Sequence, residues 1–207
     1  MRTFTNYQKF LKQIEEVKQL DYKPTLLLHC CCGPCSCYPL LLLKDYFDIT
    51  IFYNNSNIFP KSEFDLRFNT IESYVKNINL EHNVNIKIIK REYKNEEFNK
   101  ILEKRKSDKE GQVRCFTCYA LRYKELCEYA HKENFEYVCS VMTISRQKNE
   151  EMINKILAGY ASKYKNIKYL HSNFKKDKGL EKAQQIIKQT KMYSQNYCGC
   201  KFSMREN

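Results

Sequence analysis

The chain has 207 residues, of which 43% are hydrophobic and 29% charged, and its formal net charge is +12. This composition excludes disordered and fibrous proteins, and the length is typical of one domain that buries its core without disulfides. The basic charge favours a polyanionic partner, nucleic acid above all, although compositional drift is an alternative source of part of the lysine excess.

The number of cysteines and the first residues of the chain indicate the cellular compartment. Eleven cysteines are an odd number, so complete internal pairing is impossible. The chain opens with MRTFTNYQKFLKQIEEVKQL, a charged amphipathic pattern unlike the apolar core of a signal peptide. We therefore expect a cytoplasmic protein, in which clustered thiols stay reduced and bind metal or take part in chemistry. The apolar stretch 25–43 holds two prolines and several thiols, so we expect a strand, a turn and a helix there and no membrane span.

Strands alternate with helices in the predicted secondary structure. The hydrophobic pattern predicts strands over 25–30, 48–55, 85–93, 136–143 and 166–173. It predicts helices, after an amphipathic segment at the start of the chain, over 34–46, 60–80, 95–106, 115–135, 149–161 and 179–191. The alternation predicts an α/β fold with an open, mainly parallel five-stranded sheet flanked by helices. No linker divides the chain, so we expect a single domain over 1–207.

Three polar or thiol-rich segments directly follow predicted strands. HCCCGPCSCY (29–38) follows the first strand, YNNSN (53–57) the second and TISRQKN (143–149) the fourth. Functional sites in open α/β sheets lie at the carboxyl ends of the strands. We therefore expect the three segments to face one crevice.

Cys115 and Cys118 form a C-x-x-C motif at the start of a predicted helix, whose N-terminus favours the thiolate. Zinc, an iron–sulfur cluster and a redox-active dithiol are the alternatives for such a pair. The distant cysteines after the first strand favour a four-thiolate site, either structural zinc or [4Fe–4S]. Cys31 and Cys32 are adjacent, so they fit poorly around one tetrahedral zinc but reach two irons of a cubane, which favours iron–sulfur.

The remaining cysteines fall into two groups. Cys198 and Cys200 flank Gly199, which frees the backbone to aim both thiols in one direction. A second metal site, a strained disulfide and a free exposed pair are the alternatives for this motif. We expect Cys127 and Cys139, within a predicted helix and strand, to pack as small hydrophobic residues. The four histidines show no ligand spacing, and no phosphate-binding loop follows the first strand, so ATP chemistry is not expected.

Five segments in fixed order resemble the QueH-type epoxyqueuosine reductases: LLLHCCCGPCSCY, FYNNSNIFPKSEFDLR, RCFTCYALR, SRQKNEEMI and YSQNYCGCKFS. The resemblance runs from about Leu26 to Ser203. It implies an α/β fold of the adenine nucleotide α-hydrolase (HUP) type. It also implies a [4Fe–4S] enzyme that reduces epoxyqueuosine in the anticodon wobble position of tRNA to queuosine. This reaction is a two-electron deoxygenation for which an external donor supplies the electrons.

The resemblance implies two sets of metal ligands. The [4Fe–4S] cluster ligands would be Cys31, Cys32, Cys115 and Cys118. An adjacent mononuclear iron would be held by Cys35, with Cys198 and Cys200 assigned to the same neighbourhood. Cys35 and Tyr197 are the expected catalytic residues, and Lys148 and Asn149 are further candidates for the proton donor.

The chain departs from the family pattern in places. Cys30 and Cys37 are additional thiols and therefore alternative cluster ligands, and Ser194 stands where relatives typically carry arginine. Residues 1–22 form an N-terminal helical extension, which we expect either to contact RNA or to pack on the domain. Residues 192–207 form a cysteine-containing tail that we expect to pack at the site.

Two other functions are alternatives. A non-enzymatic RNA-binding protein would use the four cysteines for structural zinc. An iron–sulfur tRNA thiolase of related fold would need the ATP-binding loop that the first strand does not lead into. Stoichiometric zinc without an iron–sulfur chromophore in the purified protein would identify the structural zinc protein, whereas the thiolase differs from the reductase by its need for the ATP-binding loop.

Overall fold

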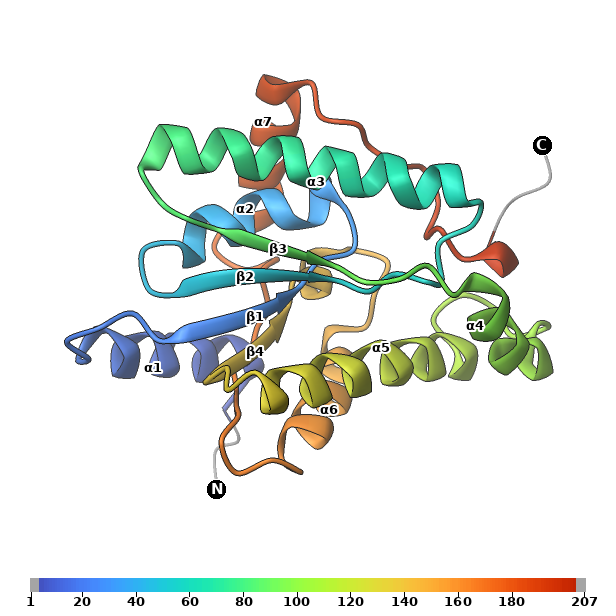
Figure 1. Ribbon diagram of the computed structural model, residues 1–207, viewed down its shortest axis with the longest axis horizontal. Coiled ribbons are helices and arrows are strands. Elements are labelled where there is room, and N and C mark those ends of the chain that lie inside the picture. Colours follow the sequence, from blue (N-terminus) through green and yellow to red (C-terminus); the bar gives the residue numbers. More distant parts are fainter. Residues whose placement is uncertain (1–3, 204–207) are drawn as a thin grey trace.

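Five strands form a wholly parallel sheet in a computed structural model that describes residues 4–203 (Figure 1). The strands are β1 (Thr25–His29), β2 (Asp48–Tyr53), β3 (Lys87–Lys90), β4 (Tyr137–Ser140) and β5 (Lys168–Tyr169). The α-helices are α1 (Asn6–Lys18), α2 (Gly33–Leu43), α3 (Lys61–His82), α4 (Asn95–Leu102), α5 (Val113–Lys132), α6 (Glu150–Ala161) and α7 (Gly179–Thr190). Three short 3-10 helices are η1 (Glu103–Arg105), η2 (Val141–Ile144) and η3 (Lys201–Ser203). The predicted α/β class and parallel sheet are confirmed, and the arrangement fits the expected HUP type.

The strand order β3-β2-β1-β4-β5 places β1 in the middle, where it pairs with both β2 and β4. Leu27, for example, lies opposite Thr50 on one side and Val138 on the other. The chain adds β2 and β3 on one side of β1 and then β4 and β5 on the other, so the direction of winding reverses between β1 and β4. Ligands of open α/β sheets bind at the carboxyl ends of the strands beside such a reversal.

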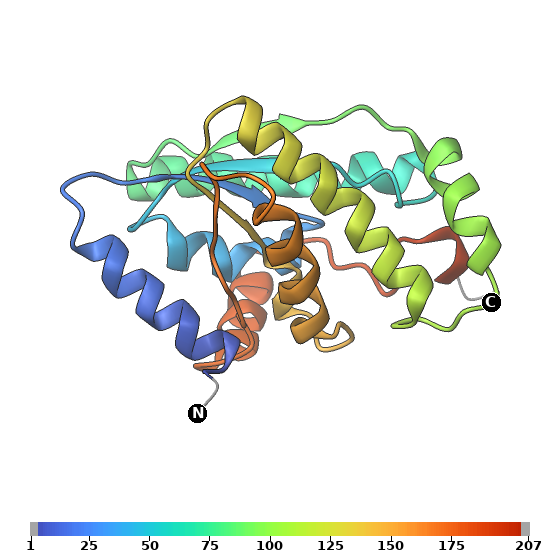
Figure 2. The same ribbon diagram turned by 90° about the horizontal axis from the view of Figure 1, so that it is seen from below.

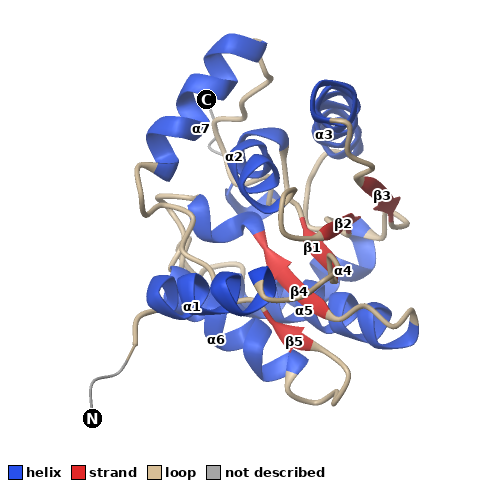
Figure 3. Cartoon of the chain, turned by 90° about the vertical axis from the view of Figure 1, so that its left-hand side faces the viewer, coloured by secondary structure: helices blue, strands red, loops and turns tan. Residues whose placement is uncertain are grey.

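Helices cover both faces of the sheet. α2, α3 and α7 lie on one face, and α5 and α6 lie on the other (Figures 1 and 3). Leu26 and Leu28 of β1 belong to the core on the first face, whereas Leu27 belongs to the core on the second. Side chains alternate along a strand, so a central strand buried on both faces needs an uninterrupted apolar sequence.

The apolar stretch 25–43 forms β1, a turn and α2, as predicted. Pro34 lies in the first turn of α2, where its missing N–H removes no helical hydrogen bond. A Cβ at Gly33 would lie 2.7 Å from Sδ of Met192, so a larger residue would require that side chain to move where α2 approaches the C-terminal segment. Within residues 4–203, no helix is both long and apolar enough to cross a membrane.

α1 packs on the domain through one face and lies beside α7 (Figure 2). A capping box begins the helix, because Thr5 Oγ1 accepts from the Gln8 N–H and Gln8 Oε1 accepts from the Thr5 N–H. Its buried residues are Phe10, Ile14 and Val17. Of the two roles expected for the extension 1–22, the buried face of α1 therefore shows packing on the domain. Residues 1–3 of the extension lie outside the described part.

The fifth strand is much shorter than the predicted 166–173, since β5 spans only Lys168–Tyr169. The backbone of Ser172 bonds to a side chain of α6 in place of a strand. Asn154 Nδ2 donates to the Ser172 carbonyl over 2.8 Å, and Asn154 Oδ1 accepts from the Ser172 N–H over 3.0 Å. A buried amide thus satisfies backbone groups that the sequence pattern assigned to the sheet.

Candidate functional site

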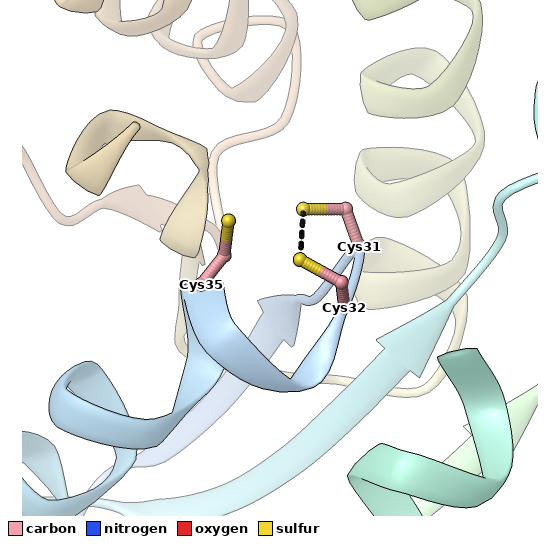
Figure 4. Close-up of side chains that lie close together, drawn as sticks. All are labelled: Cys31, Cys32 and Cys35. Atoms are coloured by element: carbon pink, nitrogen blue, oxygen red, sulfur yellow. Dashed lines mark hydrogen bonds between the residues drawn. The ribbon is translucent and has the colours of Figure 1, made fainter. Parts of the chain in front are cut away.

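Three thiols converge in the turn between β1 and α2. The Sγ atoms of Cys31, Cys32 and Cys35 all lie within 4.8 Å of one another, and Figure 4 shows them pointing together. Cys32 is the N-cap of α2 and Cys35 lies in its first turn, so the helical spacing brings the two thiols to the same side. In residues 4–203 no other set of three or more cysteine, histidine or acidic side chains meets this separation.

Hydrogen bonds among these thiols shift the pKa values of Cys31 and Cys32 in opposite directions. The Sγ atoms of Cys31 and Cys32 lie 3.7 Å apart, and Gln195 Nε2 lies 2.9 Å from Cys32 Sγ. Bonds from Cys31 and Cys35 hold the pKa of Cys32 well below its usual range, whereas the bond to Cys32 raises the pKa of Cys31 to about 11. Cys32 is therefore the thiol most easily present as the thiolate, which is the form that binds metal.

A cavity of about 190 Å³ lies beside the thiol turn; we call it the thiol cavity. Its walls include Cys31 and Cys35 after β1, Asn57 after β2, Lys148 after β4, and Cys198 near the C-terminus. The predicted convergence of the segments after the first, second and fourth strands is confirmed.

Four further thiols come from the start of α5 and from the C-terminal segment. Burial raises the pKa of Cys118 to about 12, and the nearby thiols of Cys198, Cys200 and Cys115 act in the same direction. Cys115 Sγ accepts a hydrogen bond from the Gly111 N–H over 3.2 Å. Of these thiols, Cys198 lines the thiol cavity, so the C-x-C motif connects the two groups of cysteines.

A buried arginine holds the C-terminal segment in place. Arg67 is 2% exposed and pairs with Glu63 over 2.6 Å. Its two terminal nitrogens donate to the backbone carbonyls of Cys198, over 3.0 Å, and Tyr197, over 3.2 Å. Gly199 has a φ of +96°, and a Cβ there would lie 2.8 Å from Arg67 Nη1. Glycine is thus required both by the backbone conformation and by the arginine that lies against it.

The C-terminal segment also pairs with the loop before α3. Ile58 and Cys200 form an antiparallel bridge, and the Phe59 N–H donates to the Gly199 carbonyl over 2.8 Å. The Tyr197 hydroxyl donates to the Phe59 carbonyl over 2.7 Å. Residues of the predicted 192–207 tail therefore lie at the site, while its last residues, 204–207, are outside the described part.

Arg122 is a buried cation that the sequence did not reveal as a site residue. It is 3% exposed and lines the thiol cavity, and no carboxylate among residues 4–203 forms an ion pair with it. Nη1 lies 3.5 Å from His29 Nε2, and burial together with this arginine lowers the pKa of His29 to about 3. Burial alone would lower the pKa of Arg122, but the thiols of Cys118 and Cys31 raise it. A buried cation without a carboxylate is costly, so an anionic group bound among these thiols would be its natural counter-charge.

Lys148 brings a second cation to the thiols. Its side chain is 11% exposed, and Nζ lies 3.3 Å from Cys198 Sγ and 3.8 Å from a Glu110 carboxylate oxygen. Burial would lower the pKa of Lys148, but the Cys198 thiol raises it overall. Asn149, the neighbouring candidate proton donor, is the N-cap of α6, where its Oδ1 accepts from the Met152 N–H.

The other cysteines are all fully buried. Cys127 and Cys139 pack in the two cores, as predicted. Cys30 and Cys37 also lie in the core between α2 and the sheet, with no measurable exposure. The sequence did not distinguish these two from their neighbours; the structure assigns them to packing.

Comparison with known proteins identifies close relatives. The family model described as "Epoxyqueuosine reductase QueH" matches residues 26–206. Proteins of that name from Staphylococcus epidermidis and Staphylococcus aureus are each 36% identical over 201 residues, covering 96% of this chain and 84% and 83% of the relatives. The relative of the same name from Thermotoga maritima is 30% identical over 185 residues, covering 88% of this chain and 91% of its own length.

Proposed function

The chain belongs to the epoxyqueuosine reductase QueH family of oxidoreductases, and we propose that it reduces epoxyqueuosine in the wobble position of tRNA to queuosine. The observation that carries the proposal is the set of three thiols, Cys31, Cys32 and Cys35, held within 4.8 Å in a segment that matches the family. The expected cytoplasmic location stays a prediction.

The proposed reaction is a two-electron deoxygenation. The epoxide takes up two electrons and two protons, both carbon–oxygen bonds break, a carbon–carbon double bond forms, and the oxygen leaves as water. An external donor must supply the electrons. The protein therefore needs a redox centre, a proton source and a surface that receives RNA.

The donor set suits an iron–sulfur centre. We propose a [4Fe–4S] cluster on Cys31, Cys32, Cys115 and Cys118, and a second metal held by Cys35, Cys198 and Cys200. All seven cysteines are free thiols, and thiolate is the ligand such clusters use. When bound, the cluster would supply single electrons and the second metal Lewis acidity.

The protein's own residues supply charge balance, position and protons. Arg122 and Lys148 offset the negative charge that several thiolates concentrate in a buried site. Arg67 and Gly199 fix the direction of the C-terminal thiols. Lys148 also holds protons on Nζ beside Cys198, whereas the predicted catalytic Tyr197 donates its hydroxyl proton to a backbone carbonyl.

Anaerobic purification followed by activity measurement tests the function. We expect a brown protein containing iron and sulfide that converts epoxyqueuosine tRNA to queuosine tRNA with dithionite, as seen by mass analysis of digested nucleosides. Cys31→Ser and Cys118→Ser should lose the chromophore, while Cys127→Ser, matched in chemistry but buried in the core, should keep it.

Two outcomes would contradict the proposal. A fully clustered protein that leaves epoxyqueuosine unchanged would exclude the reaction. A colourless protein with stoichiometric zinc would exclude the cluster and favour a structural zinc site.

A further inference from the structure

A groove with a volume of about 230 Å³ lies next to the thiol cavity; we call it the α7 groove. Cys35, Ser145 and Gln147 line both hollows. Cys35 comes from the first turn of α2, and the other two follow η2 after β4. The α7 groove therefore opens at the same reversal of strand order as the thiols and reaches one of them from a second side.

Part of the lining of the α7 groove is apolar. Leu180, Ala183 and Ile187 lie on one stripe of α7, at helical spacings of three and four. Ile144 of η2 also lines the groove. Aliphatic side chains from α7 and η2 thus give the groove an apolar lining suited to the flat face of a ring system.

Polar side chains accompany this apolar lining. Gln147 and Gln184 are exposed carboxamides that line the α7 groove from its two sides, and each offers both a donor and an acceptor. Arg146 is exposed and lines the same groove. Carboxamides read the edges of nucleobases, and arginine binds phosphate.

The surrounding surface is basic. Between residues 175 and 191 the chain carries six lysines and only two acidic residues. The lysines are Lys175, Lys176, Lys178, Lys182, Lys188 and Lys191. A segment of this charge beside the α7 groove complements a polyanion such as RNA.

We propose that the α7 groove receives the base of the modified wobble nucleoside, so that its epoxide-bearing arm reaches Cys35. This placement rests on the proposed reductase function. The thiol cavity is smaller and lined by cations and thiols, which suits the metal centre, whereas the α7 groove has the apolar lining that a base requires. Its volume is below the about 300–1,000 Å³ of pockets for drug-sized ligands, so one ring system enters and the ribose and phosphates stay outside.

Substitutions at the mouth of the α7 groove test this placement without disturbing the core. Gln184→Ala and Arg146→Ala remove exposed polar groups that line the groove. Gln185→Ala is the matched control, because Gln185 is exposed on the same helix and does not line the groove. Binding is measured by fluorescence anisotropy with an anticodon stem–loop that carries queuosine, the stable product.

We expect Gln184→Ala and Arg146→Ala to weaken binding of the stem–loop about tenfold and to raise KM for epoxyqueuosine tRNA with kcat nearly unchanged. Gln185→Ala should match the wild-type chain in both, and all three variants should keep the wild-type visible spectrum. Wild-type affinity in all three variants, or no binding by the wild-type chain, would overturn the placement.

The two measurements separate this inference from the proposed function. Groove-dependent binding without any conversion of epoxyqueuosine would reject the reductase function and retain the nucleoside site. Equal conversion and equal affinity in all variants would retain the reductase and reject the site. A defect confined to turnover driven by a protein electron donor, absent with dithionite, would assign the α7 groove to that donor and also overturn the placement.

Discussion

Gly199 combines a backbone φ of +96° with a Cβ direction that points at Arg67, whose Nη1 would lie 2.8 Å away. The same arginine donates to the carbonyls of Tyr197 and Cys198. A side chain at this position would therefore displace the group that holds the C-terminal thiols. Glycine is required between Cys198 and Cys200 by the close approach of Arg67 as much as by the positive φ of the backbone.

We expect Gly199→Ala to lower the free energy of unfolding by about 1–3 kcal/mol, because alanine adopts this backbone conformation only under strain. Urea denaturation followed by circular dichroism measures the change. Gly159→Ala is the control, since a Cβ there meets nothing within 4 Å in the last turn of α6. That variant should be neutral or more stable by about 0.5–1 kcal/mol. Equal effects at both positions would contradict the role of Arg67 as the obstructing group.

We expect the positive charge of Arg122 to influence the redox chemistry of the thiol site. The arginine is buried beside thiols and has no carboxylate partner within residues 4–203. If a cluster occupies the thiols, the cation stabilises the reduced state, which carries one more negative charge. We expect Arg122→Gln to lower the reduction potential by about 60 mV, equal to a tenfold change in a one-electron equilibrium.

A redox titration followed by electron paramagnetic resonance measures this shift. Arg122→Lys is the matched variant, because it keeps the charge while changing the shape, and it should retain most of the wild-type potential. An unchanged potential in Arg122→Gln with an intact cluster would show that the arginine serves packing alone.

At the scale of elements, a side chain of α6 takes the place of a longer β5. Asn154 is 3% exposed and bonds to both backbone groups of Ser172 and to the Tyr169 hydroxyl. This amide joins α6 to the strand edge and to the segment that leads into α7. The segment that leads into α7 is therefore bonded to a side chain of α6 that lies eighteen positions earlier in the sequence.

We expect Asn154→Ala to lower the free energy of unfolding by about 2–3 kcal/mol, because buried groups lose their partners. Asn69→Ala is the control on α3, where the asparagine is exposed, and should change stability by less than about 0.5 kcal/mol. Urea denaturation of both variants gives the comparison. A small effect at Asn154 would mean that water replaces the amide at the edge of the sheet.

For the whole molecule, the net charge of +12 predicts RNA binding that weakens as salt rises. The logarithm of affinity should fall linearly with the logarithm of salt concentration, measured by anisotropy with an anticodon stem–loop. Lys188→Gln, on exposed α7, should reduce the slope by about one. Lys165→Gln, exposed before β5 at the opposite end of the sheet, should leave it unchanged. A flat salt response would exclude charge as the source of affinity.

The class of fold and the location of the site could be predicted from the sequence because both are local patterns. The three leucines of TLLLH are consecutive because β1 is buried on both faces, and the thiols of the site follow this strand directly in the chain. The end of β5 could not be predicted, because it depends on Asn154 bonding to residues eighteen positions away. Arg122 was missed for a similar reason, since a single arginine in a helix carries no sign of what surrounds it.

The order of the cysteine motifs by itself determined the family and predicted that the candidate site is built from thiols. Only the tertiary structure decided which thiols share a site. It buries Cys30 and Cys37 in the core and brings Cys35 to Cys31 and Cys32. The physical reason is geometric: whether a thiol in this turn faces the core or the cavity depends on the end of β1 and the first turn of α2, which take their positions from the packing of distant strands and helices.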